Sequence, residues 1–348
     1  MTSTKRRIAG VEGGGTTWVC AIANEDLEIL ERASFPTTST PSETLAAIGE
    51  WLGAREVEAL GVASFGPVDP DPASATYGYI TATPKPGWQQ TDVIGFLKRY
   101  VRVPTKFDTD VNAPAFAEWS LKPSLASLAY VTVGTGVGVG LVVNGKPLHG
   151  LLHPEAGHIS CPRYPGDDPE TSDLDALDCP GWLEVESMTA TRALARRAGV
   201  PATELQNLPD SHPVWDVAAF YLAAMCANLV LVVSPQKIIL SGGVMQRESL
   251  FPKIKRNLIK FLNGYIPAKQ LEDDDYVAPS CWGNDAGIYG ALVLAKQALD
   301  DDEEEEEEED AGSSSLHRRW ATYAAAAAAA ASAAGVVLFT AMSRRRHH

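Results

Sequence analysis

The stretch Arg7-Ile-Ala-Gly-Val-Glu-Gly-Gly-Gly-Thr-Thr-Trp-Val-Cys-Ala-Ile-Ala23 places a run of glycines between two apolar segments. Apolar segments on either side of a glycine turn are typical of a β-hairpin. Further strands and helices are expected at 27–35, 42–55, 59–65, 93–100, 105–110 and 113–120. This order predicts an α/β lobe with a mixed sheet.

A second set of elements repeats this arrangement from residue 128 onward. Three strands joined by glycine turns are expected at 128–133, 137–143 and 146–148, and a buried strand at 237–240. Helices are expected at 188–198, 214–233, 249–261 and 284–299. Because the two halves resemble one another, the sequence predicts two α/β lobes, 1–114 and 115–284, with a ligand cleft between them.

The composition is that of an acidic globular protein. The 348 residues are 45% hydrophobic and 21% charged, with a formal net charge of −15. Eleven acidic residues at 300–310 and five arginines beyond them leave the first 299 residues at −9. A body this acidic repels the phosphate backbone, so no nucleic-acid partner is expected.

The cysteines indicate a reducing compartment. They are scattered without a Cys-x-x-Cys pair, at Cys20, Cys161, Cys179, Cys226 and Cys281. The first residues lead directly into a strand and do not read as a secretory signal. We therefore expect reduced thiols and a cytoplasmic location for the folded body.

The carboxyl-terminal segments differ from the body. Residues 300–319 form an acidic and Ser-rich linker, and 320–348 are Ala-rich with a basic end. The uncharged stretch from Trp320 to Met342 is long enough to span a bilayer, with arginines on both sides. Its alanine block is only weakly lipophilic, so a membrane anchor and a solvated helix both stay open.

The first glycine turn has the chemistry of an anion site. Gly14 and Gly15 present backbone N–H groups without a Cβ in the way, and Thr16 and Thr17 add hydroxyl donors. Glu12 can hold Mg²⁺ through a water molecule. A plain hairpin turn explains the same residues, and no Walker loop is present because no Gly-Lys-Ser/Thr ending follows.

Two further turns extend this pattern. Gly134, Thr135 and Gly136 lie between two strands, which argues against a dinucleotide-binding fold. Two glycine hairpins facing one cleft form a cradle for β- and γ-phosphates. Gly242 and Gly243 form a tight turn where a flat ring can approach the backbone, although helix entry explains this turn equally well.

Polar side chains gather after one strand and in one loop. Asp110 can accept a proton from a sugar hydroxyl and Asn112 can bond a neighbouring hydroxyl, although helix capping explains part of this cluster. Glu155 and His158 are three residues apart and can both point at a polyol. A metal site or ordinary surface polarity are the alternatives for this second pair.

Six groups of residues occur in an order that is more specific than any one of them. They are Glu12-Gly-Gly-Gly-Thr16, Ala63-Ser-Phe-Gly-Pro-Val68, Tyr77-Gly-Tyr-Ile-Thr81 with Thr83-Pro-Lys-Pro-Gly-Trp88, Asp108-Thr-Asp-Val-Asn-Ala113, Gly134-Thr-Gly-Val-Gly-Val-Gly140 with His153-Pro-Glu-Ala-Gly-His158, and Ser241-Gly-Gly-Val244. Over residues 7–298 the chain resembles the ROK (repressor, ORF, kinase) family, and most closely its fructokinase branch.

The resemblance implies an actin-like (RNase H-like) ATPase fold, two lobes around a central cleft, with a last helix over 285–299 packed back on the first lobe. It implies ATP- and Mg²⁺-dependent phosphorylation of a hexose, here fructose, at the 6-hydroxyl. The implied roles are a catalytic base at Asp110, sugar contacts at Asn112, Glu155, His158 and Glu184, phosphate contacts at Gly14, Gly15, Thr16, Thr17, Gly134, Thr135 and Gly136, and adenosine contacts at Gly242 and Gly243.

The chain departs from the family pattern in three places. Thr17 stands where the family usually has lysine, which leaves one phosphate charge unpaired. Trp182 stands where a zinc-ligating cysteine is expected, and Cys179 alone cannot replace the lost ligands, so no structural zinc, or only a weak one, is expected. The third departure is the acidic and Ala-rich tail.

Several alternatives stay open. A repressor of the same family would need a helix-turn-helix before the first strand, and Arg7 leaves no room for one. A membrane-tethered sugar sensor would lack the base or the phosphate turns. Mannose, glucose or N-acetylmannosamine can replace fructose as the hexose. The family resemblance also suggests a homodimer.

Overall fold

The computed structural model describes residues 5–167 and 183–304. Contacts divide the chain into two units, Met1–Ala298 and Leu299–His348. The first unit contains both sheets described below. In the second, residues 300–304 are helical and exposed. The predicted Ala-rich segment at 320–348 and all but the first residues of the predicted linker lie outside the described residues.

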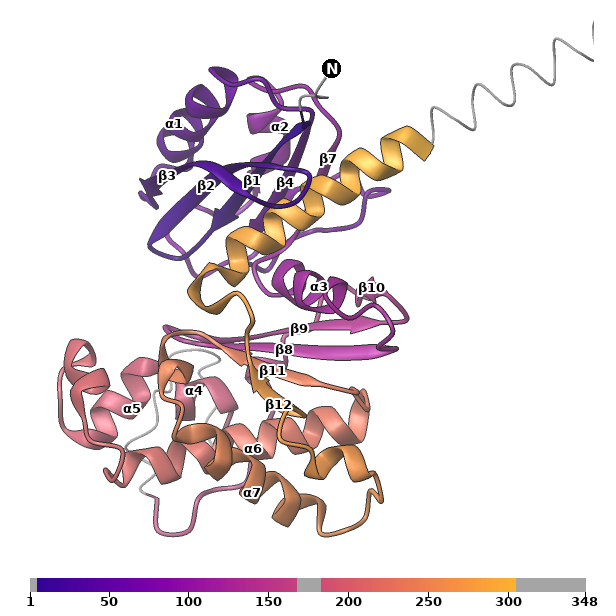
Figure 1. Ribbon diagram of the computed structural model, residues 1–348. Helices are drawn as coiled ribbons and strands as arrows, with labels where there is room; N and C mark the ends of the chain where they lie inside the picture. Colours follow the sequence, from indigo (N-terminus) through magenta and orange to yellow (C-terminus); the bar gives the residue numbers. More distant parts are fainter. Residues whose placement is uncertain (1–4, 168–182, 305–348) are drawn as a thin grey trace, which may run out of the picture. The chain divides into compact units, whose positions relative to one another are not determined.

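The first lobe is built on a mixed sheet with the strand order β3-β2-β1-β4-β7 (Figure 1). The first three strands form antiparallel pairs, and β4 and β7 extend the sheet in parallel from β1. The strands are β1 Arg7–Gly13, β2 Thr17–Asn24, β3 Ile29–Pro36, β4 Ala59–Ser64 and β7 Thr105–Thr109, with a separate pair β5 Tyr79–Ile80 and β6 Thr91–Asp92. The helices of this lobe are α1 Pro41–Gly53 and α2 Val93–Leu97.

The second lobe repeats that order as β10-β9-β8-β11-β12. Its antiparallel and parallel pairs also correspond to those of the first sheet. The strands are β8 Ser127–Val133, β9 Val137–Val143, β10 Lys146–Pro147, β11 Ile238–Ser241 and β12 Val277–Pro279. The α-helices that follow β7 are α3 Asn112–Ser120, α4 Val185–Thr189, α5 Thr191–Ala198, α6 Val214–Val232 and α7 Leu250–Leu262, and the 3₁₀ turns are η1 Ala156–His158, η3 Ala202–Asn207, η4 Gly243–Gln246, η5 Lys269–Glu272 and η6 Gly283–Asp285.

The core of the first lobe contains a pair of tryptophans. Trp18 and Trp88 are fully buried, and their rings stack with centroids 5.3 Å apart. The Trp88 indole N–H donates to the Thr38 carbonyl oxygen at 2.8 Å, which satisfies its polar atom. This pair fixes the loop that contains Trp88 against the strand that follows the first glycine turn.

A final helix begins at Ala286, and its residues within the first unit, 286–298, lie against the first sheet (Figure 1). A Cβ atom at Gly10 of β1 would lie 2.9 Å from Leu292 Cγ, and one at Gly61 of β4 would lie 1.9 Å from the Ala291 carbonyl oxygen. Glycine at both positions therefore allows the helix backbone to approach the sheet closely.

The helix predicted at 188–198 is wrong as a single element, because the structure divides this region into α4 and α5. Ala190 has an extended backbone, with φ −59° and ψ 152°. The break lets Thr191 hydrogen-bond through both its N–H and its hydroxyl to the Gly134 carbonyl oxygen, each at 2.8 Å. The helix is therefore interrupted where it supports the second glycine turn.

Among the described residues, α6 has the length and apolar composition of a membrane span. However, 72% of its most apolar window is buried inside the protein. Its residues, including Met225 and Leu222, belong to the hydrophobic core of the second lobe. Its apolar character is therefore explained by packing.

Candidate active site

The carboxyl ends of the parallel strands bring polar residues of the first lobe together. In register, Gly13 of β1 lies beside Ser64 of β4, and Ser64 lies beside Thr109 of β7. Asp110 follows directly, and its N–H donates to the Ser64 carbonyl oxygen at 2.8 Å. Ligands of α/β sheets bind outside this kind of edge, so the fold presents Glu12 and Asp110 where a ligand is expected.

Glu12 is a carboxylate in an unfavourable environment. Burial raises its pKa to about 7, and the charge of Asp110 adds to this effect. Its carboxylate lies against Gly287 in the first turn of the final helix, because a Cβ there would be 1.9 Å from Glu12 Oε1. Arg32 partly offsets the cost, but its guanidinium is paired with Asp285 at 2.7 Å. Glu12 is thus a partly buried carboxylate close to a second one.

Asp110 has an equally perturbed carboxyl group. Burial raises its pKa to about 7, and the negative charge of Glu155 contributes in the same direction. Glu155 belongs to the second lobe, so this interaction brings a predicted sugar contact close to the predicted base. A carboxyl group with a pKa near neutrality is suited to accept a proton in catalysis.

The side chains of Asp108 and Asn112, two residues before and after Asp110, are held by hydrogen bonds. Asp108 is buried, and its carboxylate binds His149 Nε2 at 2.9 Å and the Thr109 N–H at 2.7 Å. Asn112 is fully buried; its side-chain oxygen accepts the Leu141 N–H at 3.2 Å. Asn112 therefore joins α3 to β9, and the sugar contact proposed for it stays a prediction.

The predicted sugar contacts of the second lobe form a pair. His158 Nδ1 and Glu184 Oε2 are 2.9 Å apart, and Glu184 is buried while His158 is partly exposed. Glu184 precedes α4, and its backbone pairs with Ser160. The structure thus brings two sequence-distant predicted residues together in one hydrogen bond.

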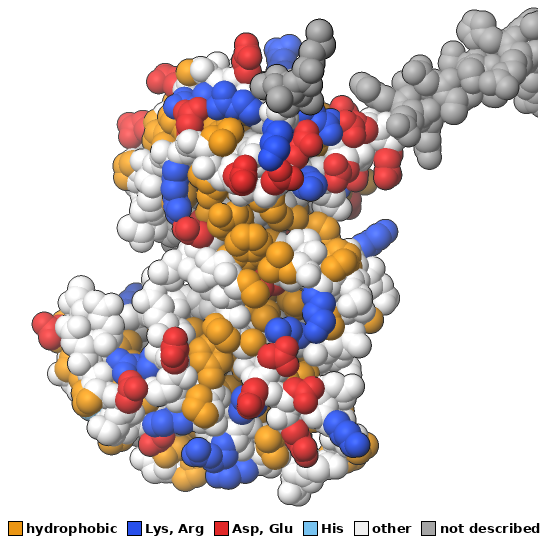
Figure 2. All heavy atoms as spheres, in the orientation of Figure 1, with side chains coloured by type: hydrophobic (Ala, Val, Ile, Leu, Met, Phe, Trp, Pro, Cys, Tyr) orange, Lys and Arg blue, Asp and Glu red, His pale blue; other side chains and the backbone are white. Residues whose placement is uncertain are grey.

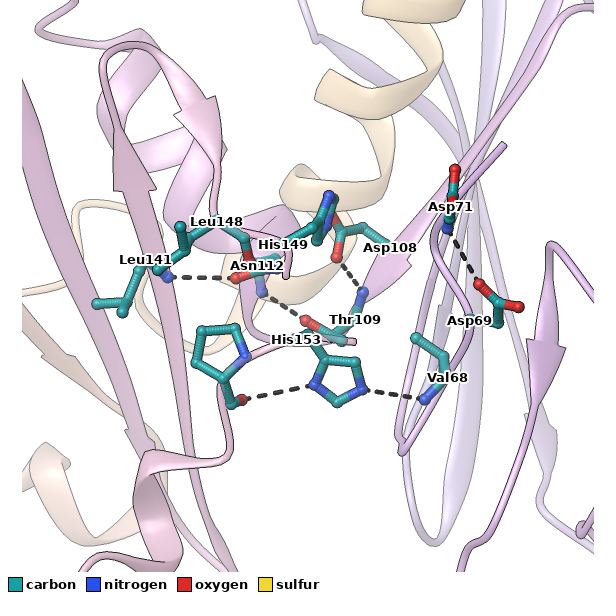
Figure 3. A network of polar contacts seen from close by, with 11 residues as sticks. Val68, Asp69, Asp71, Asp108, Thr109, Asn112, Leu141, Leu148, His149 and His153 are labelled. Carbon is teal, nitrogen blue, oxygen red and sulfur yellow. Dashed lines mark hydrogen bonds and ion pairs between the residues drawn. The ribbon is translucent and has the colours of Figure 1, made fainter. Parts of the chain in front are cut away.

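One residue near the site received no role from sequence. His153 is buried, and its Nε2 accepts the Val68 N–H of the first lobe at 3.0 Å (Figure 3). Its Nδ1 lies 3.6 Å from Glu155 Oε1. His153 opens the same short motif that contains Glu155 and His158, but a contact across 85 positions leaves no periodic signal in the sequence.

The first glycine turn is a tight hairpin. The Gly14 N–H donates to the Thr17 carbonyl oxygen at 3.0 Å, and the Thr37 hydroxyl donates to the Gly14 carbonyl oxygen at 2.8 Å. Gly15, Thr16 and Thr17 are exposed at its tip. These bonds hold the turn while leaving its tip accessible to a ligand.

The second glycine turn is held from α4 and α5. The Gly134 N–H donates to the Gly136 carbonyl oxygen at 2.9 Å, and Thr191 binds the Gly134 carbonyl oxygen as described above. The Val137 N–H donates to Glu186 Oε2 at 2.7 Å. The sequence gives no signal for this contact of Glu186, because its partner is 49 positions away.

The third turn adjoins the second. The backbone of Gly242 packs closely against Val133 at the end of β8, since a Cβ at Gly242 would lie 2.5 Å from the Val133 carbonyl oxygen. A cavity of about 540 Å³ opens beside it, in the second lobe. Its lining includes Thr191, Gly243, Trp215 and Arg247. This volume is in the range of small-ligand sites. Thr191, which supports the second glycine turn, is one of the residues that line the cavity.

Residues 5–167 and 183–304 contain no group of three or more His, Cys, Asp or Glu side chains arranged to hold a metal ion. Mg²⁺ is often held by one or two carboxylates together with water and phosphate, so Glu12 and Asp110 fit it. Cys179 and Trp182 lie outside the described residues, so the zinc prediction stays a prediction.

The whole arrangement was compared with known proteins. The model of the family described as "ROK family" matches residues 8–298. The chain belongs to the ROK family. It is 39% identical over 295 residues to a fructokinase of Pediococcus pentosaceus, a match that covers 84% of this chain and 98% of that protein. It is 36% identical over 292 residues to a fructokinase of Streptococcus mutans, with 82% and 96% covered.

Solved structures of the ROK family share the fold. The ROK hexokinase from Thermus thermophilus superposes with a TM-score of 0.66 at 25% identity, covering 85% of this chain and 99% of that one. A ROK family glucokinase from Streptomyces griseus, solved with glucose and AMPPNP, gives a TM-score of 0.66 at 22% identity, with 84% and 99% covered. The predicted actin-like α/β fold is confirmed.

Proposed function

We propose that this protein is an ATP-dependent fructokinase that forms fructose 6-phosphate, with Asp110 as the general base. The observation that carries the proposal is the position of Asp110, at the strand ends of the first lobe, close to Glu155 of the second lobe and with a pKa raised to about 7. The identity of 36–39% to fructokinases over most of the chain supports fructose as the hexose.

In this mechanism Asp110 accepts the proton of the 6-hydroxyl as that oxygen attacks the γ-phosphorus of ATP. Protein kinases and sugar kinases need little covalent help from the protein, so positioning and electrostatics dominate. Glu155, and the His158–Glu184 pair, would orient the sugar hydroxyls. Asn112 would assist from its buried position at the start of α3.

The two glycine turns are the proposed phosphate contacts. Backbone N–H groups near Gly14, Gly15, Thr16 and Thr17 and near Gly134, Thr135 and Gly136 would stabilise the charge that moves onto the phosphate oxygens. The 540 Å³ cavity beside Gly243 would receive the adenosine, with Gly242 and Gly243 next to it. Sugar and nucleotide would thus be bound by different sets of residues.

Glu12 is the residue that would hold Mg²⁺, through water, and Asp110 lies close to it. When bound, Mg²⁺ would offset the negative charge of the phosphate groups. The protein's own contribution is an electrostatic one, because two desolvated carboxylates near each other favour a cation between them. Binding of Mg²⁺ would lower the pKa of both groups.

The test is an ADP-release assay with purified full-length protein, ATP and Mg²⁺ over a panel of fructose, mannose, glucose and N-acetylmannosamine. We expect fructose to give the highest kcat/KM. Turnover of another hexose above fructose would revise the substrate, and activity on none of them would contradict the kinase assignment and favour a sugar sensor.

The cysteines and the surface charge bear on the location and the partners of the protein. The four described cysteines are free thiols, which supports a reducing compartment such as the cytoplasm. Acidic and basic side chains are mixed over both lobes on the face shown in Figure 2, which fits a small-molecule enzyme better than a nucleic-acid binder. The homodimer and the membrane contact through the tail stay predictions, and fractionation of full-length protein against residues 1–299 tests the latter.

A further inference from the structure

One segment of the second lobe contacts the first lobe at separate points. Residues 148–155 follow β10, and His149 binds Asp108 of β7 at 2.9 Å while His153 accepts the Val68 N–H at 3.0 Å (Figure 3). Asp108 lies in β7, two residues before Asp110, and Val68 follows the neighbouring strand β4. The segment therefore links the second lobe to the region of the first sheet that carries Asp110.

The hydrogen bonds of His153 define the role of each ring nitrogen. The Val68 N–H can only donate, so Nε2 must carry a lone pair. In the neutral ring the proton then lies on Nδ1. Nδ1 is 3.5 Å from the Pro154 carbonyl oxygen and 3.6 Å from Glu155 Oε1. One nitrogen thus faces the first lobe and the other faces the carboxylate of the second.

The surroundings of the ring leave it little freedom. Only 4% of the His153 side chain is exposed. A Cβ at Gly66 would lie 3.2 Å from His153 Cε1, so the glycine provides the space that the ring fills. A buried ring bonded to a backbone N–H has a fixed orientation. Glu155 is different, because 45% of its side chain is exposed, and it gains order from a fixed neighbour.

We propose that His153 is a positioning residue that links the approach of the two lobes to the orientation of the sugar-binding carboxylate Glu155. The Val68–His153 bond forms only when the lobes are close, and the ring that it orients stands beside Glu155. Glu155 in turn lies near Asp110, and its negative charge raises the pKa of that carboxyl group. This inference rests on the proposed kinase function and adds a device that couples closure to hexose binding.

The two nitrogens can be tested separately because two amide side chains each reproduce one of them. In His153→Gln the amide oxygen reaches the position of Nε2 and can still accept from Val68. In His153→Asn the amide nitrogen reaches the position of Nδ1, but the acceptor for Val68 is lost. Both variants remove the ring and add an amide of similar polarity, so they control for each other.

We expect His153→Asn to raise the KM for fructose about five- to tenfold, the range for one lost hydrogen bond, and to leave the KM for ATP within about twofold. His153→Gln should keep the fructose KM within about threefold of the wild type. Hydrolysis of ATP relative to fructose phosphorylation should increase in His153→Asn, because a less closed site admits water. Hydrogen–deuterium exchange at the Val68 amide should accelerate in the Asn variant and not in the Gln variant.

Equal behaviour of the two variants in all three measurements would overturn the inference. If His153→Asn does not fold, Gly66→Ala displaces the same ring by its Cβ and should raise the fructose KM in the same direction. Failure of the proposed function is a separate outcome, since the wild type would then phosphorylate no hexose, while Val68 exchange would still report the contact between the lobes.

Discussion

The carboxyl ends of the parallel strands can be compared between the two lobes, because both sheets have the same strand order. In the first lobe, β1 contains Glu12 near its end and Asp110 follows β7. In the second lobe, the equivalent strands β8, β11 and β12 end near Thr132, Ser241 and Ser280. In the first lobe this edge therefore presents carboxylates beside a glycine turn, whereas the equivalent strand ends of the second lobe present hydroxyls beside glycine turns.

This difference relates to the two chemical tasks of the proposed reaction, proton acceptance and phosphate binding. Carboxylates accept protons and hold a cation, whereas neutral turns with free backbone N–H groups receive anionic phosphate. In the first lobe the glycine turn at 14–17 and the carboxylates of Glu12 and Asp110 share one edge, so phosphate bound there would need a cation to offset the negative charge. At the equivalent strand ends of the second lobe Thr132, Ser241 and Ser280 stand in place of carboxylates, so phosphate would meet less negative charge there.

The strongest test of this comparison is Asp110→Asn. We expect kcat to fall on the order of 10²-fold or more, because the amide cannot accept the proton of the sugar hydroxyl. Asp108→Asn is the matched control; Asp108 is two residues away, but its carboxylate is bound to His149 and the Thr109 N–H. Steady-state kinetics with fructose decides between them. Near-normal turnover of Asp110→Asn would remove Asp110 from the role of base.

The glycine turns differ between the lobes in how much they depend on glycine for packing. A Cβ at Gly13 would lie 2.6 Å from the buried Trp18 ring, whereas one at Gly136 would lie 2.7 Å from the Glu186 carboxylate. We expect Gly13→Ala to lower the free energy of unfolding by about 2–3 kcal/mol, since the ring cannot move away. Gly136→Ala should cost only about 1 kcal/mol, because Glu186 can rotate and lose one hydrogen bond.

Gly15→Ala and Gly134→Ala are the controls for these two substitutions. Neither added Cβ would meet an atom within 4 Å, so stability should change by less than about 0.5 kcal/mol. Denaturant unfolding measures all four variants. If Gly134→Ala leaves stability intact but raises the KM for ATP, the open side of that turn faces the nucleotide; unchanged ATP kinetics would argue against the phosphate contact.

The sequence predicted the fold well because the fold depends on local patterns. The hairpin around residues 12–17 and its repetition at 134–140 follow from apolar segments separated by glycines, which are readable without contacts. The strand ends then place Glu12 and Asp110 at one edge by topology alone. The break at Ala190 was missed, because an Ala-rich helical pattern contains no signal that Thr191 binds a turn 57 positions earlier.

The site could be predicted only in part, because several of its residues depend on contacts with distant parts of the chain. The motif at 153–158 identifies Glu155 and His158 by residue type, but His153 acquires its role from a backbone N–H of the other lobe. Similarly, the sequence predicts Asn112 as a sugar contact or a helix cap, whereas the structure buries it and bonds its side-chain oxygen to the Leu141 N–H. Side-chain chemistry is visible in a sequence, whereas burial and partners across the lobes depend on tertiary packing.

The pH dependence of catalysis tests the contact between the carboxylates of the two lobes. Asp110 must be deprotonated, and burial raises its pKa to about 7 in the protein without Mg²⁺. Because Mg²⁺ lowers this pKa, kcat/KM should fall about tenfold per pH unit below a midpoint at or under that value. Glu155→Gln removes a charge that raises this pKa, so the midpoint should move to lower pH even as the fructose KM increases. Glu43→Gln, in the first turn of α1, is the control. An unchanged midpoint in Glu155→Gln would separate Glu155 from the base.

The smallest expected effect concerns the other histidine between the lobes. The hydrogen bond from Asp108 raises the pKa of His149, burial opposes it, and the charges of Asp108 and Asp71 add to the increase. A histidine whose folded pKa is above its ordinary value of 6.5 stabilises the fold fully below that value, and this stabilisation is lost as pH rises through the folded pKa.

His149→Asn should therefore lower the free energy of unfolding more at about pH 6 than at about pH 9. The side chain of His149 is 36% exposed, so solvent screening should keep the difference below about 1 kcal/mol. Glu12 and Asp110, whose pKa values are both raised, also make the wild type less stable as pH rises from about 4 to 7, so only the difference between wild type and variant isolates His149. An equal loss at both pH values would mean that the ion pair with Asp108 contributes nothing, and that the lobes are held at this point by packing and by the neutral hydrogen bond alone.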